Sequence, residues 1–229
     1  MKRIWFGTLT VIAVLGAQCT VQEDDIRDEG LRYLALGDSY TIGESVAPTL
    51  RWPVQLVDSL YSRGLQVDPA TILATTGWTT ADLLEGIEAT QPDTIEWDLV
   101  SLLIGVNNQY QGLSIQEYAM EFDELLDRAI AMAGGRPDRV FVVSIPDYGY
   151  TPFGQSNQST ISAELMQFND TCRVHATARG IAHYPITDIS QGWPEQEGLV
   201  AADGLHPSGW QYGLWVSSFV DEVANQLND

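Results

Sequence analysis

Positive charge is scarce in this sequence. Lys2 is the single lysine among 229 residues, and lysine and arginine together number 11, against 31 aspartates and glutamates. The resulting formal net charge of −20 gives a surface that repels nucleic-acid phosphates and anionic lipid headgroups. We therefore expect no nucleic-acid partner.

Histidine is scarce as well, with three residues at His175, His183 and His206. Neither His175 nor His183 stands in a cluster with the spacing of metal ligands, and a metallophosphoesterase needs more ligands than three histidines supply. The sequence also has no glycine-rich loop that would cradle a phosphate. We interpret His175 and His183 as structural residues, and we predict neither a metal site nor a cofactor.

The chain has two cysteines, Cys19 and Cys172. Two cysteines in an exported chain could pair, but Cys19 lies in a short tether and Cys172 in the middle of an expected helix. If Cys19 is lipidated, Cys172 has no partner left within the chain. We therefore expect no intramolecular disulfide.

The N-terminus differs in composition from the rest of the chain. A positively charged start is followed by an almost wholly apolar run over residues 4–17. This run is too short to span a bilayer as a permanent helix, and the pattern is typical of an export signal. We predict that residues 1–18 are an export signal peptide.

Residues 15–19 resemble a bacterial lipobox, in which the cysteine is lipidated after cleavage. Gln18 stands where a small residue is usual, so plain cleavage followed by secretion is the alternative. We expect a lipidated Cys19 and an acidic tether over residues 19–30, with membrane association through the lipid anchor. One domain follows, over residues 31–229, and we expect it to be a monomer.

The domain has no internal repeat, no low-complexity segment and no linker. Apolar runs alternate with helical patterns instead, which predicts a three-layer α/β/α sandwich around a parallel sheet. The predicted strands cover residues 31–36, 70–74, 99–104, 140–145 and 181–186. The predicted helices cover 53–61, a segment that Thr79 or Thr80 caps, 114 to the glycines at 134–135, about 157–179, and 208–227.

Residues suited to nucleophilic catalysis follow the strands. Ser39 comes directly after the first strand, and Asp203 and His206 follow the fifth at a spacing that a turn can close. A serine hydroxyl needs a base, and the base needs a third group that fixes its tautomer. Gly77 offers a backbone N–H and Asn107 a side-chain amide to an oxyanion. The alternatives are a plain strand-to-turn junction at Ser39 and a solvated loop before the last helix.

A different serine-hydrolase arrangement finds no support. The α/β-hydrolase elbow requires Gly-x-Ser-x-Gly, and the segment nearest to it, residues 154–157, lacks the closing glycine.

Four short segments, in this order, resemble the four sequence blocks of the SGNH hydrolases, also called the GDSL esterase/lipase family. The resemblance covers the chain from about Leu31 to Leu227. The four segments are Gly37-Asp38-Ser39, Gly77, Gly105-Val106-Asn107 and Asp203-Gly204-Leu205-His206.

The resemblance implies Ser39 as the nucleophile, His206 as the base and Asp203 as the partner of the base. It also implies oxyanion donors from Ser39, Gly77 and Asn107, and a five-stranded parallel sheet of order 2-1-3-4-5, as in flavodoxin. The chain departs from the family at one place. The third block usually ends in Asp, where this sequence has Asn108, and the change affects the loop that orients Asn107.

Further residues near the strand ends are expected to line a substrate cleft, although aromatic residues there could also simply cover the sheet. The candidates are Trp78, Asn108, Tyr110, Tyr148 and Phe153.

We predict an exported serine esterase that hydrolyses acyl esters through an acyl-Ser39 intermediate, with a small-molecule, lipid or carbohydrate ester as substrate. The resemblance also implies carbohydrate O-acetyl esterase, thioesterase and lysophospholipase activities as alternatives, because one site can serve all of them. A non-enzymatic alternative is a surface lipoprotein that binds glycans or acyl ligands. The intact Ser39, Asp203 and His206 argue against that alternative.

Overall fold

The computed structural model describes residues 30–228 together with Met1. The expected export signal and the Cys19 tether lie outside the described residues. Within the described part of the chain, no helix is both long and apolar enough to cross a bilayer.

Five parallel strands form one sheet in the order β2-β1-β3-β4-β5. Every residue of β1, β3 and β4 is buried, because helices cover both faces of the sheet. The predicted fold class and strand order are therefore confirmed. The strands are β1 (Tyr33–Gly37), β2 (Thr71–Ala74), β3 (Leu99–Leu103), β4 (Val140–Val143) and β5 (Ala182–Tyr184).

The fifth strand is shorter than its predicted span of residues 181–186. Pro185 has no N–H to give to the sheet. The N–H of Ile186 donates to the side chain of Ser144 instead, at 2.9 Å.

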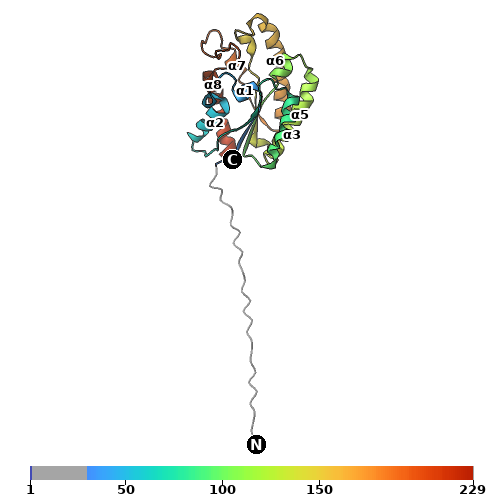
Figure 1. Cartoon of the computed structure of the whole chain (residues 1–229), viewed down its shortest axis with the longest axis vertical. Helices are drawn as coiled ribbons and strands as arrows, with labels where there is room; N and C mark the ends of the chain where they lie inside the picture. The colour runs from blue at the N-terminus through green and yellow to red at the C-terminus, as the bar shows by residue number, and fades with distance from the viewer. Residues whose placement is uncertain (2–29, 229) are drawn as a thin grey trace.

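Figure 1 shows two helical layers, with α2 and α8 on one side of the sheet and α3, α5 and α6 on the other. Trp52 joins the first layer to the sheet, because its ring meets Phe141 of β4 and Phe219 of α8 edge to face. In the second layer, Tyr118 of α5 packs on Phe168 of α6. The long helices are α2 (Trp52–Tyr61), α3 (Thr80–Thr90), α5 (Ile115–Met132), α6 (Gln158–Ala178) and α8 (Gly209–Asn228).

Short helical segments gather near the carboxyl ends of the strands, where ligands bind in sheets of this type. They include α1 (Ser39–Ile42), α4 (Val106–Tyr110), α7 (Thr187–Ser190), η1 (Pro48–Leu50), η4 (Tyr148–Tyr150) and η5 (Gln155–Asn157). Two further turns, η2 (Pro92–Thr94) and η3 (Pro137–Arg139), precede β3 and β4.

Both ends of the described domain lie near the amino ends of the strands, opposite the carboxyl ends where the short helical segments gather. The chain enters β1 at Tyr33, and α8 runs back along the sheet to Asn228 (Figure 1). The carboxyl ends of the strands therefore point away from both ends of the domain.

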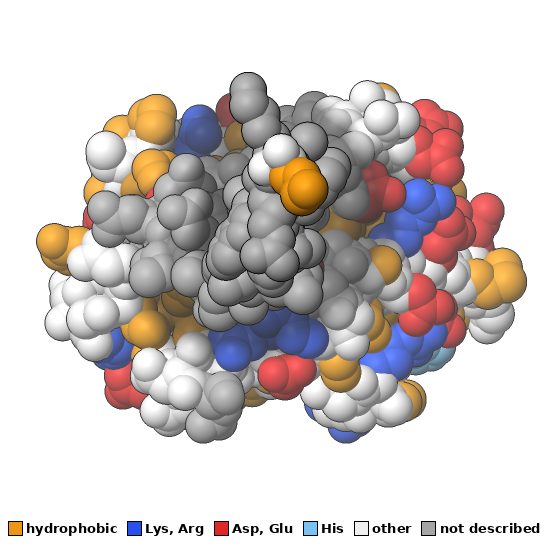
Figure 2. All heavy atoms as spheres, turned by 90° about the horizontal axis from the view of Figure 1, so that it is seen from below, with side chains coloured by type: hydrophobic (Ala, Val, Ile, Leu, Met, Phe, Trp, Pro, Cys, Tyr) orange, Lys and Arg blue, Asp and Glu red, His pale blue; other side chains and the backbone are white. Residues whose placement is uncertain are grey.

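Arginine side chains at the surface stand among carboxylates. In the view from below, blue cationic side chains lie beside red acidic ones (Figure 2). Ion pairs that join arginines to carboxylates include Arg63–Asp221 and Arg128–Glu124. Arginines that take part in these ion pairs thus stand beside acidic side chains.

Candidate active site

The turn between β1 and α1 places Ser39 at the first position of a helix. The carboxylate of Asp38 caps this helix and accepts a hydrogen bond from the N–H of Tyr40 at 3.0 Å. Gly37 is required before the turn, because a Cβ there would collide with the hydroxyl of Thr41 and the carbonyl of Leu103. Ser39 is 4% exposed, and its hydroxyl borders a pocket.

Asp38 itself is fully buried beneath the nucleophile turn. Burial raises the pKa of Asp38 to about 7, although hydrogen bonds with the backbone at Tyr40, Asp38 and Gly105 act in the opposite direction. Its Oδ2 atom has no hydrogen-bond partner among the described residues. Asp38 therefore shapes the turn from below, while Ser39 faces the pocket.

The loop before α8 carries an aspartate and a histidine that bind each other. The Nδ1 atom of His206 lies 2.6 Å from Oδ2 of Asp203. The other carboxylate oxygen, Oδ1, accepts the N–H groups of Leu205 at 2.9 Å and of His206 at 3.0 Å. These bonds close the three-residue spacing and leave the Nε2 atom of the imidazole free to face elsewhere.

The Asp203 carboxylate receives several hydrogen bonds. Partial burial raises the pKa of Asp203, but hydrogen bonds from Ser45, from the His206 side chain and from the backbone of Leu205 and His206 outweigh burial and lower the pKa to about 2. The carboxylate is therefore ionised at neutral pH and can hold the Nδ1 proton of His206.

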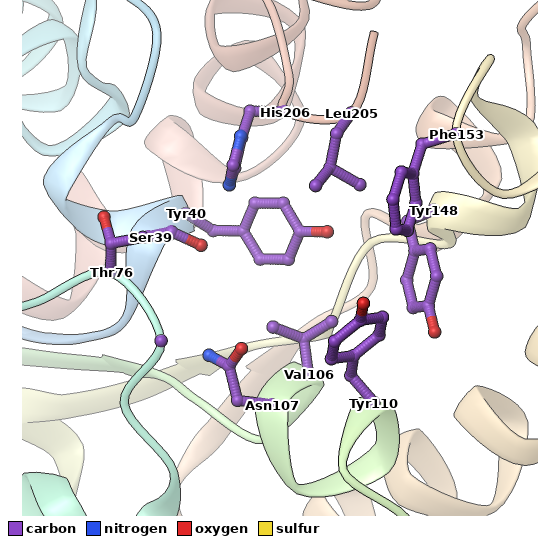
Figure 3. A pocket seen from close by; sticks show the side chains of 11 residues that line it. Ser39, Tyr40, Thr76, Val106, Asn107, Tyr110, Tyr148, Phe153, Leu205 and His206 are labelled. Atoms are coloured by element: carbon purple, nitrogen blue, oxygen red, sulfur yellow. The ribbon is translucent and has the colours of Figure 1, made fainter. Parts of the chain in front are cut away.

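Ser39 and His206 meet at one cavity of about 260 Å³. Figure 3 shows the far end of the imidazole directed toward Ser39. Among the described residues no hydrogen bond joins the two side chains, and such bonds often tighten only in the complex with substrate. The cavity is lined by Ser39, Tyr40, Thr76, Gly77, Val106, Asn107, Tyr110, Tyr148, Phe153, Leu205 and His206.

Gly77 and Asn107 line the same cavity as Ser39. Gly77 has a φ of +88°, which favours glycine in the loop after β2. The amide of Asn107 donates one hydrogen bond to the carbonyl of Trp78 at 2.9 Å. This bond ties α4 to the Gly77 loop and leaves the second amide proton of Asn107 for a ligand.

A sequence model of the GDSL-like lipase/acylhydrolase family matches residues 35–214. The chain belongs to this family. The match spans the nucleophile turn and both of the Asp203 and His206 positions.

Solved structures from several bacteria share the fold. The psychrotrophic esterase EstA from Pseudoalteromonas sp. has a TM-score of 0.66 at 16% identity, over 86% of this chain and 99% of that one. A lipase/acylhydrolase from Enterococcus faecalis gives 0.64 at 20% identity, over 86% and 97%. The acetylxylan esterase Axe2 from Geobacillus stearothermophilus gives 0.63 at 18%, over 85% and 94%. A search of curated proteins by sequence finds no match.

Two of the expected cleft residues in this GDSL-like chain do not line the cavity, and for these two the prediction is corrected. The indole of Trp78 turns away, because it packs over Gly86 of α3, where even a Cβ would contact the ring. Only the carbonyl of Trp78 serves the site, through Asn107. Asn108 is fully buried behind the cavity.

Asn108 has a definite structural task in this chain. Its Oδ1 accepts the N–H of Thr80 at 3.1 Å, and its Nδ2 donates to the Thr80 hydroxyl at 2.6 Å. The hydroxyl of Thr80 in turn donates to Glu121. An amide fits here because it offers both an acceptor and a donor, and it braces the Gly77 loop against α4.

Four lining residues were missed by sequence reasoning: Tyr40, Thr76, Val106 and Leu205. Val106 and Leu205 lie inside the quoted segments, and Tyr40 and Thr76 are direct neighbours of Ser39 and Gly77, so the available signal was a position within or next to a motif.

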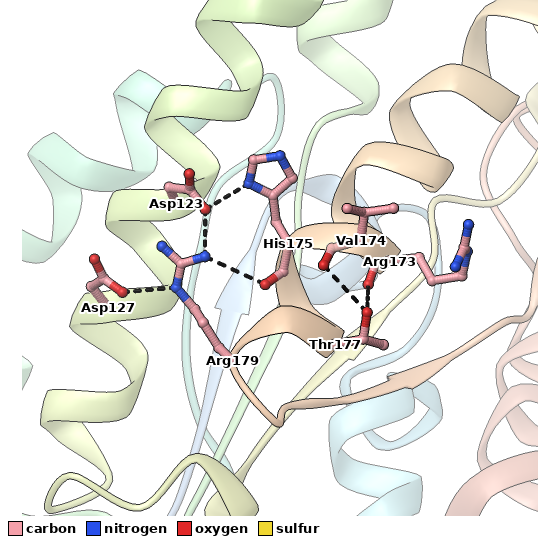
Figure 4. A network of polar contacts seen from close by, with 7 residues as sticks. All are labelled: Asp123, Asp127, Arg173, Val174, His175, Thr177 and Arg179. Carbon is pink, nitrogen blue, oxygen red and sulfur yellow. Dashed lines mark hydrogen bonds and ion pairs between the residues drawn. The ribbon is translucent and has the colours of Figure 1, made fainter.

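The other two histidines have structural partners. Nδ1 of His175 lies 2.6 Å from Asp123, in an ion-pair network between α5 and α6 (Figure 4). His183 lies 3.5 Å from the buried thiol of Cys172, and burial raises the pKa of that thiol to about 12. Within residues 30–228, no three His, Cys, Asp or Glu side chains are grouped as metal ligands.

Proposed function

We propose that this protein is a serine esterase that hydrolyses carboxylic esters through an acyl-Ser39 intermediate. The observation that carries the proposal is the shared cavity of Ser39 and His206, with Nδ1 of His206 bound to Asp203 at 2.6 Å. An imidazole held in this way presents Nε2 to the serine hydroxyl, as a general base requires.

In the first half of the reaction, Oγ of Ser39 attacks the ester carbonyl while Nε2 of His206 takes the hydroxyl proton. The carbonyl oxygen becomes an oxyanion, and the N–H groups of Ser39 and Gly77 and the amide of Asn107 stabilise it. The C–O bond to the alcohol then breaks, and His206 returns the proton to the leaving oxygen.

In the second half, a water molecule attacks the acyl-Ser39 carbonyl. Nε2 of His206 takes a proton from this water, and the same donors hold the new oxyanion. Ser39 leaves with the proton from His206, and the carboxylic acid is released. Asp203 stabilises the imidazolium in both halves, because its carboxylate is ionised beside Nδ1.

The chemistry of the cavity wall supports a neutral, apolar acyl group. Apolar and aromatic side chains line the cavity opposite the polar donors, and His206 is the single titratable side chain with a basic nitrogen among the lining residues. A cavity of about 260 Å³ suits a short or medium acyl chain, whereas a long chain would have to leave the mouth.

Deacetylation of a carbohydrate is the second candidate. Tyr110 and Phe153 are 61% and 51% exposed, and they pack on each other and on Tyr148 at the cavity wall. Exposed aromatic faces next to a nucleophile offer apolar surface on which a sugar ring can pack. The fold relative from Geobacillus stearothermophilus is an acetylxylan esterase.

A fluorophosphonate probe tests the proposal directly, because it labels only an activated serine. We expect covalent labelling of Ser39, located by peptide mass spectrometry, and no labelling in Ser39→Ala. The same substitution should lower hydrolysis of a nitrophenyl butyrate ester by about 10⁴-fold or more. A folded wild-type protein that resists labelling would support a ligand-binding role instead.

A comparison of hydrolysis rates distinguishes the acyl esterase from the carbohydrate deacetylase. Nitrophenyl esters from acetyl to octanoyl are compared with acetylated xylo-oligosaccharides at equal concentration. A preference for butyryl or hexanoyl esters supports the acyl esterase. A kcat/KM that is highest on the acetylated sugar supports the second candidate.

A further inference from the structure

Ser45 has an unusual backbone conformation for its residue type. Its φ is +64°, and among the described residues only one other non-glycine residue, Gln91 at +49°, has a positive φ. The left-handed region is unfavourable for a side chain with a Cβ, and residues held there often have a functional reason. Gln91 ends helix α3, which is a common place for such a conformation. Ser45 lies in the turn that follows α1, where the N–H of Val46 donates to the carbonyl of Gly43 at 3.4 Å.

The side chain of Ser45 reaches the Asp–His pair. Its hydroxyl donates to Oδ2 of Asp203 at 2.6 Å, the same oxygen that binds Nδ1 of His206 at 2.6 Å. Oδ2 is therefore held between two donors, and one of them comes from a distant segment of the chain. The hydroxyl that reaches this oxygen belongs to a residue whose backbone lies in the left-handed region.

Asp203 needs such support because burial does not hold it. Its side chain is 30% exposed, whereas that of His206 is 12% exposed. A carboxylate on the surface can rotate and exchange partners with water unless hydrogen bonds fix it. The backbone N–H groups of Leu205 and His206 fix Oδ1, and Ser45 and the imidazole fix Oδ2.

The residue before Ser45 binds a second part of the site. The carboxylate of Glu44 accepts the hydroxyl of Thr76 at 2.5 Å, next to Gly77. The N–H of Glu44 also donates to the carbonyl of Ser39 at 3.0 Å. Two consecutive residues thus connect the nucleophile turn to the Gly77 loop and to the Asp203 loop.

We propose that Ser45 is a positioning residue of this site, whose hydroxyl fixes the Asp203 carboxylate so that His206 keeps Nε2 directed toward Ser39. The expected effect on kcat rests on the proposed esterase function. The hydrogen bond from Ser45 to Asp203 is independent of that function.

Two substitutions separate the hydroxyl from the backbone. Ser45→Ala removes the hydroxyl and keeps the unfavourable conformation, whereas Ser45→Gly removes the hydroxyl and relieves it. We expect both variants to lose about tenfold in kcat with KM unchanged, because one hydrogen bond to a charged group is lost in each. We expect Ser45→Gly to melt at a higher temperature than Ser45→Ala.

Gln91→Gly is the matched control, because it relieves the other left-handed residue far from the cavity. It should raise the melting temperature and leave kcat at the wild-type value. Ser45→Asn tests rescue, since asparagine tolerates a positive φ and its amide can donate to Asp203. We expect its kcat to lie above those of the alanine and glycine variants.

A spectroscopic readout tests the positioning without turnover. A proton held between Nδ1 of His206 and Asp203 gives a low-field proton resonance, and a His206→Ala variant identifies it. In Ser45→Ala and Ser45→Gly we expect this resonance to broaden or move upfield. Wild-type kcat and an unchanged resonance in both variants would overturn the proposal. It would also be overturned if the loss of kcat occurred only in the variant with the lower melting temperature, because the loss would then report stability.

The two proposals fail in different ways. A wild-type protein that fluorophosphonate does not label removes the esterase mechanism, but the resonance still shows whether Ser45 positions Asp203. A labelled wild-type protein with fully active Ser45 variants removes only the role of Ser45.

Discussion

The chain contains two Asp–His pairs that are alike in their direct contact. Nδ1 of His206 lies 2.6 Å from Asp203, and Nδ1 of His175 lies 2.6 Å from Asp123. In both pairs the carboxylate oxygen that binds the imidazole accepts a second donor as well. By distance alone, either histidine qualifies as an oriented base.

The second donor distinguishes the two pairs. For Asp203 it is the neutral hydroxyl of Ser45, and for Asp123 it is the guanidinium of Arg179 at 2.6 Å. A permanent positive charge on the same oxygen offsets the negative charge that would stabilise an imidazolium. Asp123 therefore serves a salt-bridge network between α5 and α6, which Arg179 extends to Asp127 at 2.8 Å (Figure 4).

The two histidines also lie at different places in the fold. His175 lies one turn from the end of α6, which leads into the start of β5. His206 lies at the other edge of the sheet, in the cavity that contains Ser39. An oriented imidazole becomes a candidate base only where the fold also presents a hydroxyl and oxyanion donors.

The largest difference between the two pairs is expected from removal of the imidazoles. His206→Ala should lower kcat on a nitrophenyl ester by about 10⁴-fold, because the base is lost. His175→Ala should leave kcat unchanged and lower only the melting temperature. Comparable losses in kcat for the two variants would contradict the distinction drawn here.

A smaller difference is expected from the carboxylates. Asp203→Asn places an amide against Nδ1 and favours the wrong tautomer, so kcat should fall by about 10³-fold or more. Asp123→Asn should keep wild-type kcat and cost less than about 1 kcal/mol of unfolding free energy, since the pair is partly exposed. Steady-state kinetics and urea unfolding of both variants provide the comparison.

The smallest effect concerns acid stability. The pKa of Asp203 is lowered from 3.8 to about 2 in the folded protein, so its carboxylate stabilises the fold above pH 3.8. This contribution is lost as the pH falls from about 4 through 2. The difference in melting temperature between wild type and Asp203→Asn should therefore shrink over that window, by roughly a few degrees at most. A constant difference from pH 6 to pH 2 would argue against the bound carboxylate.

The alternation of strands and helices predicted the parallel sheet, the family resemblance implied its strand order, and the four segments predicted which residues meet at the carboxyl ends of the strands. Ser39, Gly77, Asn107 and His206 each follow a different strand, and parallel strands bring their carboxyl ends together. Residues that follow different strands in the sequence are therefore neighbours in the folded protein. This is why four short segments carry most of the information about the site.

Ser45 shows what could not be predicted. Its partner Asp203 is 158 residues away in the sequence, and a serine in a polar loop gives no sign of a left-handed backbone. Trp78 failed as a cleft residue for a related reason. Sequence indicates that an aromatic ring is near the site, but packing over Gly86 decides which way the ring turns.

Asn108 illustrates a departure that the structure explains. An aspartate at this place would bring a second carboxylate to the Thr80 hydroxyl, which already binds Glu121. The neutral amide avoids that repulsion and still accepts the N–H of Thr80. The exchange is compatible with an intact Asn107, because the two side chains bind different loop atoms.

The placement of both chain ends has a practical consequence. Residue 30 and Asn228 lie at the edge of the sheet opposite the cavity (Figure 1). A bead, an electrode or a fused reporter domain joined directly at residue 30 or at Asn228 would sit on the side away from the cavity, which Tyr110 and Phe153 line. A direct attachment at these positions would leave the cavity that contains Ser39 facing the medium.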